Sequence, residues 1–407
     1  MVPRDHPLPT VSQIRPKHKT SIEQRCADDE MTRLMRKYQL FYLEFERQRG
    51  ARFWHQDREM IMMTSNEYLG LSHHPKVVAA GKRAIDEWGS GTTGARTANG
   101  SRTYHSRLEH KLAEFLGKEA CIVSAAGYLS CMAAVSTFAG KGDLIVVDRN
   151  VHSSLWTGIQ LTGARVERFA HNNPDDLKEL LAHENPAHPK LMVVEGIYSM
   201  EGHIVRLPEL NAIIEGHNCF TVVDDAHGFG ILGDQGNGTV ASFGLTDSVE
   251  VICGSLSKSL SSTGGFIAAS KEIVDFIKAN SKQTIFSAAI SPSQAACAEA
   301  ALQVMVDEPE HRERLWENTR YYLKILHDLE LDTWDTTTPA VPIVLGDKQR
   351  AYRAWKKLFD LGVFTVLAVS PSVPPGKDLL RTAVSARHTH DDLDQVGDAL
   401  AKATRWL

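Results

Sequence analysis

Short apolar runs that alternate with helical segments constrain the fold of this chain more than any other feature. Four runs of four or five residues cover residues 144–147, 191–195, 220–223 and 251–254. Helical periodicity lies before and between them, over residues 127–139, 153–162, 174–184 and 208–216. Because parallel strands are joined only through long crossover connections, this alternation predicts an α/β fold with a mostly parallel sheet covered by helices on both faces.

The regions outside this alternation predict further units. Proline and charged residues over 1–25 predict a loose arm, and apolar residues at helical spacing predict an amphipathic helix over 28–49. A helical stretch over 291–330 precedes short strands and helices up to residue 406. A chain of 407 residues suits more than one core. We expect an N-terminal arm and helix over 1–60, a large α/β domain over 61–295 and a small α+β domain over 296–407.

Composition argues against several classes of partner. The net charge of −5 leaves no strongly basic face for nucleic acid or an anionic membrane. No apolar run reaches the length of about 18 residues that a membrane span needs. The N-terminus lacks the apolar segment of a secretory signal, so we expect a cytoplasmic protein. The six cysteines form no CxxC pair and no zinc-finger spacing with histidine, so reduced thiols and no metal site are predicted.

Two polar groups follow the predicted strands, at the carboxyl ends where open α/β sheets bind ligands. Asp224 ends the run over 220–223, and His227 comes three residues later. This carboxylate can pair with a cationic ring nitrogen, although taken alone it fits a helix cap or a loop acid better. Lys258 follows the run over 251–254 among small residues. Burial there would lower its pKa and make it a nucleophile, although a surface lysine in a flexible loop fits equally well.

Weaker signals surround these two groups. Ser255 and Ser257 can donate hydrogen bonds to a phosphate, and Gly127 and Tyr128 open a helix whose free N–H groups can do the same. Taken alone, that helix start is an ordinary strand-to-helix turn. His152 follows the run over 144–147 and could stack on a flat ring, although a lone histidine is usually structural.

Arg381 lies in a strand-like run near the C-terminus and is a natural bidentate partner for a carboxylate, although most arginines are simply solvated. Considered together, the signals are more specific. A buried lysine, an aspartate on a neighbouring strand, a phosphate-type helix start and a stacking histidine are the components of a pyridoxal-phosphate site. An aspartate that keeps the pyridine nitrogen protonated makes that ring an electron sink.

The motifs also carry a family resemblance. The segments that resemble the α-oxoamine synthases, fold-type I enzymes of the class II aminotransferase type, are residues 64–71, 89–96, 105–109, 224–228, 255–258 and 380–388. They appear in the family's order over roughly residues 60–400. Within the family the chain most resembles the bacterial serine palmitoyltransferases, through residues 89–96, 137–142, 194–200 and 285–292.

This resemblance implies a large domain with a mostly parallel seven-stranded sheet, a smaller C-terminal α+β domain, and a homodimer with a shared active site. It implies that Lys258 holds the cofactor as a Schiff base and later moves the α-proton of the substrate. It further implies that Asp224 pairs with the ring nitrogen, that His152 stacks on the ring, and that His227 donates a hydrogen bond to the ring oxygen O3′.

The same resemblance implies the remaining site residues. The cofactor phosphate would be held by Gly127, Tyr128, Ser255 and Ser257. Ser287 would reach the phosphate of the neighbouring subunit, and Asn66 would lie near the partner's site. Arg381 would bind the carboxylate of the amino acid substrate.

The implied reaction is a decarboxylative Claisen-type condensation of serine, glycine or alanine with an acyl thioester, carried by CoA or an acyl carrier protein, to an α-amino ketone. Serine palmitoyltransferases carry an arginine in the loop before the last strand. Here that loop, residues 367–376, has none, so the amino acid stays open. The family's usual threonine is Ser255, which keeps the hydroxyl.

Other functions remain as alternatives. They include the chemistry of 8-amino-7-oxononanoate synthase or of 2-amino-3-ketobutyrate CoA ligase, and plain transamination. A binding protein without catalysis fits less well, because the lysine, the aspartate and both histidines of the expected site are all present.

Overall fold

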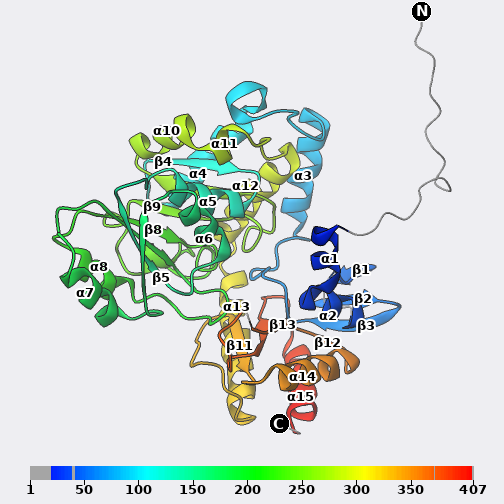
Figure 1. Ribbon diagram of the computed structural model, residues 1–407. Helices are drawn as coiled ribbons and strands as arrows, with labels where there is room; N and C mark the ends of the chain where they lie inside the picture. Colours follow the sequence, from blue (N-terminus) through cyan, green and yellow to red (C-terminus); the bar gives the residue numbers. More distant parts are fainter. Residues whose placement is uncertain (1–19, 39–41, 371, 406–407) are drawn as a thin grey trace, which may run out of the picture.

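A seven-stranded sheet forms the centre of the larger part of the molecule (Figure 1). The structure is a computed structural model, and it describes residues 20–38, 42–370 and 372–405. The strand order of the sheet is β4-β10-β9-β8-β7-β5-β6. Strands β5 to β9 pair in parallel, and only β10 runs antiparallel to its two neighbours. The strands are β4 (Ala120–Ser124), β5 (Leu144–Asp148), β6 (Arg165–Phe169), β7 (Lys190–Glu195), β8 (Cys219–Asp224), β9 (Val251–Ser255) and β10 (Gly265–Ala269). The predicted mostly parallel α/β sheet is confirmed.

Helices cover both faces of this sheet, so its central strands are buried along their length. Every residue of β5, β7 and β9 is buried, which is why these strands have continuous apolar sequences. The helices of this part are α3 (Pro75–Trp88), α4 (Thr103–Leu116), α5 (Gly127–Ser136), α6 (Ser153–Gln160), α7 (Pro174–Ala182), α8 (Leu207–Ile214), α9 (Thr239–Ser242), α10 (Lys271–Asn280), α11 (Lys282–Ile285) and α12 (Pro292–Asp307), with a π-helical turn at Arg96–Gly100. None of the helices in the described ranges is both long and apolar enough to cross a bilayer.

The N-terminal region differs from its prediction. The expected single helix over 28–49 is wrong, because the structure has α1 (Ser21–Asp28), α2 (Glu30–Tyr38) and then a strand, β1 (Arg47–Arg49), while residues 39–41 lie outside the described part. The expected loose arm ends earlier than residue 25. Thr20 caps α1, and residues 1–19 lie outside the described part.

Phe45, one of the apolar residues that suggested a longer helix, packs instead on a small sheet. Strands β1, β2 (Arg52–His55) and β3 (Arg58–Met62) form an antiparallel meander. Phe45 packs on Phe53, with ring centroids 4.4 Å apart, and both rings lie near Phe364. The aromatic side chain at position 45 therefore packs on a sheet rather than on a helical face.

A three-stranded sheet in the order β11-β14-β13 and the helices packed on it form the C-terminal part, drawn in orange and red in Figure 1. The stretch over 291–330, expected as one helical region, forms two helices, and the break between them lies at Glu308 and Pro309. The elements are α13 (Glu310–Asp328), β11 (Ala340–Val344), α14 (Lys348–Asp360), β12 (Val363–Phe364), β13 (Val366–Ala368), β14 (Leu379–Ala383) and α15 (His390–Thr404).

The N-terminal strands and the C-terminal part share a sheet and a core. Strand β3 pairs in parallel with β12, and Figure 1 shows the blue N-terminal strands beside the orange helices. Ile61 and Met63 pack in the same hydrophobic cluster as Leu380 and Leu393. The boundary expected between residues 60 and 61 falls inside β3. The division of the chain into three units at residues 60 and 295 stays a prediction.

Candidate active site

A cavity of about 200 Å³ lies at the carboxyl ends of the central strands. Strands β4, β5, β7, β8 and β9 point the same way, and each contributes a side chain or a backbone turn to this edge. The cavity is lined by Gly127, Tyr128, Cys131, His152, Ser154, Glu195, Asp224, Ala226, His227, Ser255, Ser257 and Lys258. The structure thus brings together eight of the eleven site residues expected from the sequence.

Asp224 and Lys258 lie in this cavity at the ends of adjacent strands, β8 and β9. Asp224 is buried, and its Oδ1 accepts a hydrogen bond of 3.1 Å from the N–H of Ala226, which fixes the carboxylate at the strand end. Burial lowers the pKa of Lys258, although the Asp224 carboxylate opposes that shift. A lowered lysine pKa increases the fraction of uncharged amine, which is the nucleophilic form.

His227 is held in a defined protonation state by its neighbours. Burial, with Lys258 and Arg381 nearby, lowers its pKa well below the ordinary value, so its imidazole is neutral. Its Nδ1 lies 2.7 Å from the hydroxyl of Tyr68, which itself accepts a 3.4 Å contact from Nη2 of Arg381. Because arginine can only donate, the Tyr68 hydroxyl has two acceptors for its proton, Nδ1 of His227 at 2.7 Å and Oδ1 of Asn66 at 3.5 Å, and donation over the shorter distance leaves the His227 proton on Nε2. That N–H is left to donate to a ligand oxygen.

Arg381 lies behind Tyr68, outside the lining of the cavity. Its side chain is buried on strand β14 and donates to three neutral oxygens: Asn66 Oδ1 at 2.6 Å, Ser199 O at 3.1 Å and Tyr68 OH at 3.4 Å. A buried guanidinium with only neutral acceptors keeps an uncompensated charge, which favours the approach of an anion. Asn66, expected near a partner's site, is therefore a direct neighbour of Arg381 within one chain.

One end of the cavity has the form of a phosphate site. Gly127 begins helix α5, whose N-cap residue Ala126 makes no side-chain cap, so the first N–H groups of the helix remain available to a ligand. A Cβ at position 127 would lie 2.8 Å from Cβ of Ser255, so only glycine fits. The hydroxyls of Ser255 and Ser257 lie 2.6 Å apart and face the same space.

His152 and Tyr128 border the cavity on the side of helix α6. His152 is the N-cap of α6, and its Nδ1 accepts a 3.2 Å hydrogen bond from the N–H of Ser154. Burial lowers the pKa of His152, so its ring is neutral and can stack on a flat ligand. The ring of Tyr128 lies edge-on to it at 6.2 Å, and the Tyr128 hydroxyl is 2.7 Å from Oγ1 of Thr157.

Sequence reasoning missed four residues of the lining, Cys131, Ser154, Glu195 and Ala226, and also Tyr68, which lies beside His227. Glu195 ends β7 opposite Asp224, and its buried Oε1 has no hydrogen-bond partner among the described residues. Burial, and next the charge of Asp224, raises the pKa of Glu195 well above its ordinary value. The thiol of Cys131 lies on the lining near Asp224. The strand-end position could have identified Glu195, but Tyr68 and Cys131 carry no such local signal.

Ser287 lies outside this cavity, in a segment that is tied to the glycine-rich loop over 89–101. Ala95 forms an isolated antiparallel bridge with Ala288, and the Thr97 hydroxyl donates to Ile285 O at 3.1 Å. The preceding residue, Phe286, is 81% exposed in the single chain. Loop and segment therefore form one surface feature.

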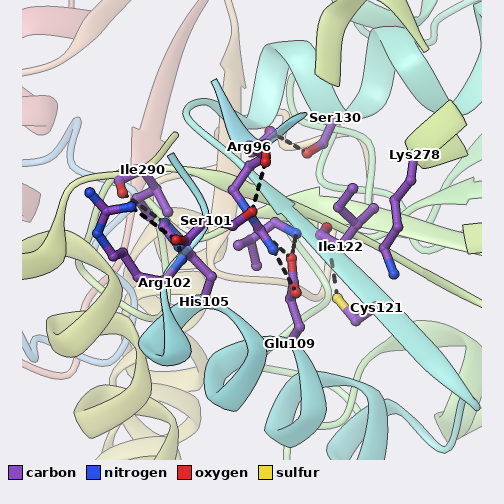
Figure 2. Close-up of polar contacts among 12 residues, drawn as sticks. Arg96, Ser101, Arg102, His105, Glu109, Cys121, Ile122, Ser130, Lys278 and Ile290 are labelled. Atoms are coloured by element: carbon purple, nitrogen blue, oxygen red, sulfur yellow. Dashed lines mark hydrogen bonds and ion pairs between the residues drawn. The ribbon is translucent and has the colours of Figure 1, made fainter. Parts of the chain in front are cut away.

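A buried ion pair fixes that loop to the body of the protein. Figure 2 shows Arg96 reaching Glu109 of helix α4, with N···O distances of 2.6 and 3.1 Å. Glu109 also accepts a 3.0 Å hydrogen bond from the N–H of Val123 on β4. His105 in the same view bonds Ile290 O at 3.0 Å, which anchors the segment beyond Ser287 as well.

Comparisons with known proteins agree with this geometry. Residues 58–400 match the family "Aminotransferase class I and II". The serine palmitoyltransferase of Sphingobacterium spiritivorum is 38% identical over 345 residues, covering 85% of this chain and 86% of that protein. The 8-amino-7-oxononanoate synthase 1 of Bacillus subtilis strain 168 is 37% identical over 350 residues, covering 86% and 89%.

Solved structures give the same result. A structure of serine palmitoyltransferase with its pyridoxal-phosphate internal aldimine superimposes with a TM-score of 0.90 at 29% identity, covering 95% of this chain and 99% of that one. The serine palmitoyltransferase of Sphingomonas wittichii gives a TM-score of 0.88 at 31% identity, covering 93% and 96%. The chain therefore belongs to the class I and II aminotransferase family and, within it, to the α-oxoamine synthases, which are pyridoxal-phosphate-dependent acyltransferases.

Proposed function

We propose that this protein condenses an L-amino acid with an acyl thioester, releasing the thiol and CO₂ and forming an α-amino ketone, with pyridoxal phosphate bound in the cavity at the strand ends. The observation that carries the proposal is the placement of a depressed-pKa lysine, Lys258, and a buried carboxylate, Asp224, in one cavity. When bound, pyridoxal phosphate supplies an electron sink for negative charge at the substrate Cα.

The residues of the cavity fit that cofactor at both of its ends. The glycine-only contact at Gly127 and the uncapped start of α5 make room for a phosphate, with the Ser255 and Ser257 hydroxyls as further donors. At the other end Asp224 offers a buried carboxylate to a cationic ring nitrogen, and His227 offers a donor to a ring oxygen. Between them the neutral ring of His152 offers a stacking surface.

Each of these residues then has a task in the reaction. Lys258 would hold the cofactor through its uncharged amine and, when free, would move the proton at the substrate Cα. Asp224 holds a proton on the ring nitrogen. Among the described residues Arg381 donates only to neutral oxygens, and it binds the substrate carboxylate.

Arg381 gives a test that separates the two substrates. Replacing Arg381 with alanine is expected to raise the KM of the amino acid by about 10²-fold, because a buried charged hydrogen-bond pair is lost. The KM of the acyl thioester should change less than about twofold, as measured by thiol release. Arg387→Ala is the matched control, since Arg387 bonds Gly70 O nearby and should leave both values unchanged. Equal losses for the two substrates would contradict the role of Arg381.

The finer substrate assignment follows the similarity to serine palmitoyltransferases: serine, glycine or alanine as amino acid and a long-chain acyl donor on CoA or a carrier protein, as in sphingolipid synthesis. The 8-amino-7-oxononanoate synthases stand at nearly the same identity, 37% against 38%, so their chemistry is the second candidate. The loop over 367–376 contains no arginine, so one sequence feature expected of an enzyme that uses serine as the amino acid is absent.

The direct test is a titration of the purified protein with serine, glycine, alanine and threonine. One amino acid is expected to shift the visible absorbance of the bound cofactor at saturation. Adding acyl-CoAs of graded length should then release one thiol and one CO₂ per turnover, with a maximum at the natural chain length. Keto-acid-dependent turnover without thiol release would show a plain aminotransferase and refute the proposal.

A cytoplasmic homodimer is part of the proposal. The segment around Ser287, with its exposed Phe286, and the glycine-rich loop bonded to it offer one surface to a second copy. Ser287 of one chain would there reach the phosphate end of the other chain's cavity.

A further inference from the structure

Two histidines and a glutamate converge outside the lining of the cofactor cavity, where three helices meet. His74 lies at the start of α3, Glu308 at the end of α12 and His311 in the first turn of α13. One ligand atom of each lies within 4.8 Å of the other two. Imidazole and carboxylate are the ligands that zinc and similar divalent ions take in proteins.

Two of the three distances within this cluster are close to those of a coordination tetrahedron. Nε2 of His74 lies 3.2 Å from Oε2 of Glu308, and Nε2 of His311 lies 3.6 Å from the same oxygen. With metal–ligand bonds of about 2.0–2.1 Å, ligand atoms of a tetrahedral zinc site lie roughly 3.3–3.4 Å apart. Little movement of the side chains is needed to admit the ion.

Neighbouring groups orient the Glu308 carboxylate and leave one nitrogen of the His74 ring without a partner among the described residues. Lys76 donates to the other carboxylate oxygen, Oε1, at 2.7 Å, and Oε2 is the oxygen that lies nearest the two imidazole rings. The ring of His74 makes no cap to its own helix, and its buried Nδ1 has no hydrogen-bond partner among the described residues. The contact between Nε2 of His74 and Glu308 therefore determines how that ring is oriented.

A neighbouring cavity leaves space for the fourth ligand. A pocket of about 540 Å³ is lined by both His74 and His311, together with His73, Arg314 and Arg387. A water molecule from this pocket can complete the coordination shell. We propose that His74, Glu308 and His311 form a binding site for one divalent transition-metal ion of the zinc type, which ties the start of α3 to the junction of α12 and α13.

Zinc titration of the cofactor-loaded protein tests this site. In amino-acid-free buffer, calorimetry and metal analysis after gel filtration are expected to show one equivalent of Zn²⁺ per chain. Mg²⁺ should not displace it, because this site offers imidazole rather than only oxygen. Glu308→Gln and His311→Ala should each weaken zinc affinity by about 10²-fold or more, since even outer-sphere changes cost about 10–100-fold.

Matched variants separate the metal site from the ion pairs. Lys76→Met breaks the Lys76–Glu308 ion pair as Glu308→Gln does, but keeps all three ligands, so it should bind zinc within about tenfold of the parent. His73→Ala changes the same pocket without touching the cluster and should bind normally. Added zinc should raise Tm for the parent and for these two variants, and not for Glu308→Gln.

Several results would overturn the assignment. No stoichiometric uptake by the parent would mean that the cluster is an ion pair only. Unchanged uptake by Glu308→Gln and His311→Ala, both checked for folding by their metal-free melting curves, would place the ion elsewhere. Loss of uptake in Cys131→Ala instead would locate it at the buried Cys131, Asp224 and Cys253 cluster.

Discussion

Replacing Lys258 with alanine is expected to remove the visible absorbance of covalently bound pyridoxal phosphate and to lower thiol release by about 10³-fold or more. The variant loses the amine that bonds the cofactor and the base that moves the substrate proton, and the second role alone contributes about 10²–10⁴-fold. The measurements are the absorbance spectrum of the purified protein and single-turnover thiol release.

The control is a lysine with an ordinary surface environment. Lys271 on helix α10 pairs with Asp275 at 2.7 Å and is exposed, so Lys271→Ala should leave the spectrum and the rate unchanged. A visible band together with substantial turnover in Lys258→Ala would mean that another amine holds the cofactor, and the site assignment would fail.

Replacing Asp224 with asparagine is expected to lower the rate by about 10²–10³-fold while part of the cofactor stays bound. Asparagine keeps the size of the side chain and can still accept the N–H of Ala226, but it carries no negative charge. A preorganised charge in a buried site contributes about this much to a rate. The steady-state rate and the cofactor content of the dialysed variant are the measurements.

Asp225 is the matched control because it is the adjacent buried carboxyl and points away from the cavity. Burial raises its pKa to about 7, and it accepts hydrogen bonds from the N–H and the hydroxyl of Thr239 at 2.7 and 2.6 Å. Asp225→Asn is expected to affect stability while keeping the rate within about tenfold. If Asp224→Asn turned over like the parent protein, the electron-sink argument would be refuted.

The central strands could be predicted because their signal is local. Residues 144–147 and 251–254 form β-prone runs that are buried on both faces. The sequence of such a strand is apolar at nearly every position. Strand β6, with Arg165, Glu167 and Arg168, is an edge strand and lacks that signal. Strand β10 consists mainly of glycine and alanine, and it was not predicted either.

The N-terminal sheet could not be predicted for a different reason. Phe45, which precedes it, continues the helical spacing of the apolar residues in α2, and only the contact of Phe45 with Phe53 and Phe364 shows that it packs on the sheet. Phe364 lies more than three hundred positions further along the chain. Tertiary packing overrode the local pattern here.

For the site, the sequence by itself determined which groups stand at the strand ends: Asp224, His152 and Lys258 follow buried runs, and the chemistry of those residue types in that order points to one cofactor class. It did so because parallel strands bring their carboxyl ends to one edge whatever the loops do.

Only the tertiary structure decided the contacts between distant segments. Tyr68 meets His227 across 159 positions, Arg381 meets Asn66 across 315, and His74 meets Glu308 across 234. No local pattern encodes such meetings, because they depend on how the C-terminal part and the helices pack against the sheet. The tautomer of His227, the uncompensated charge of Arg381 and the proposed metal site all follow from that packing.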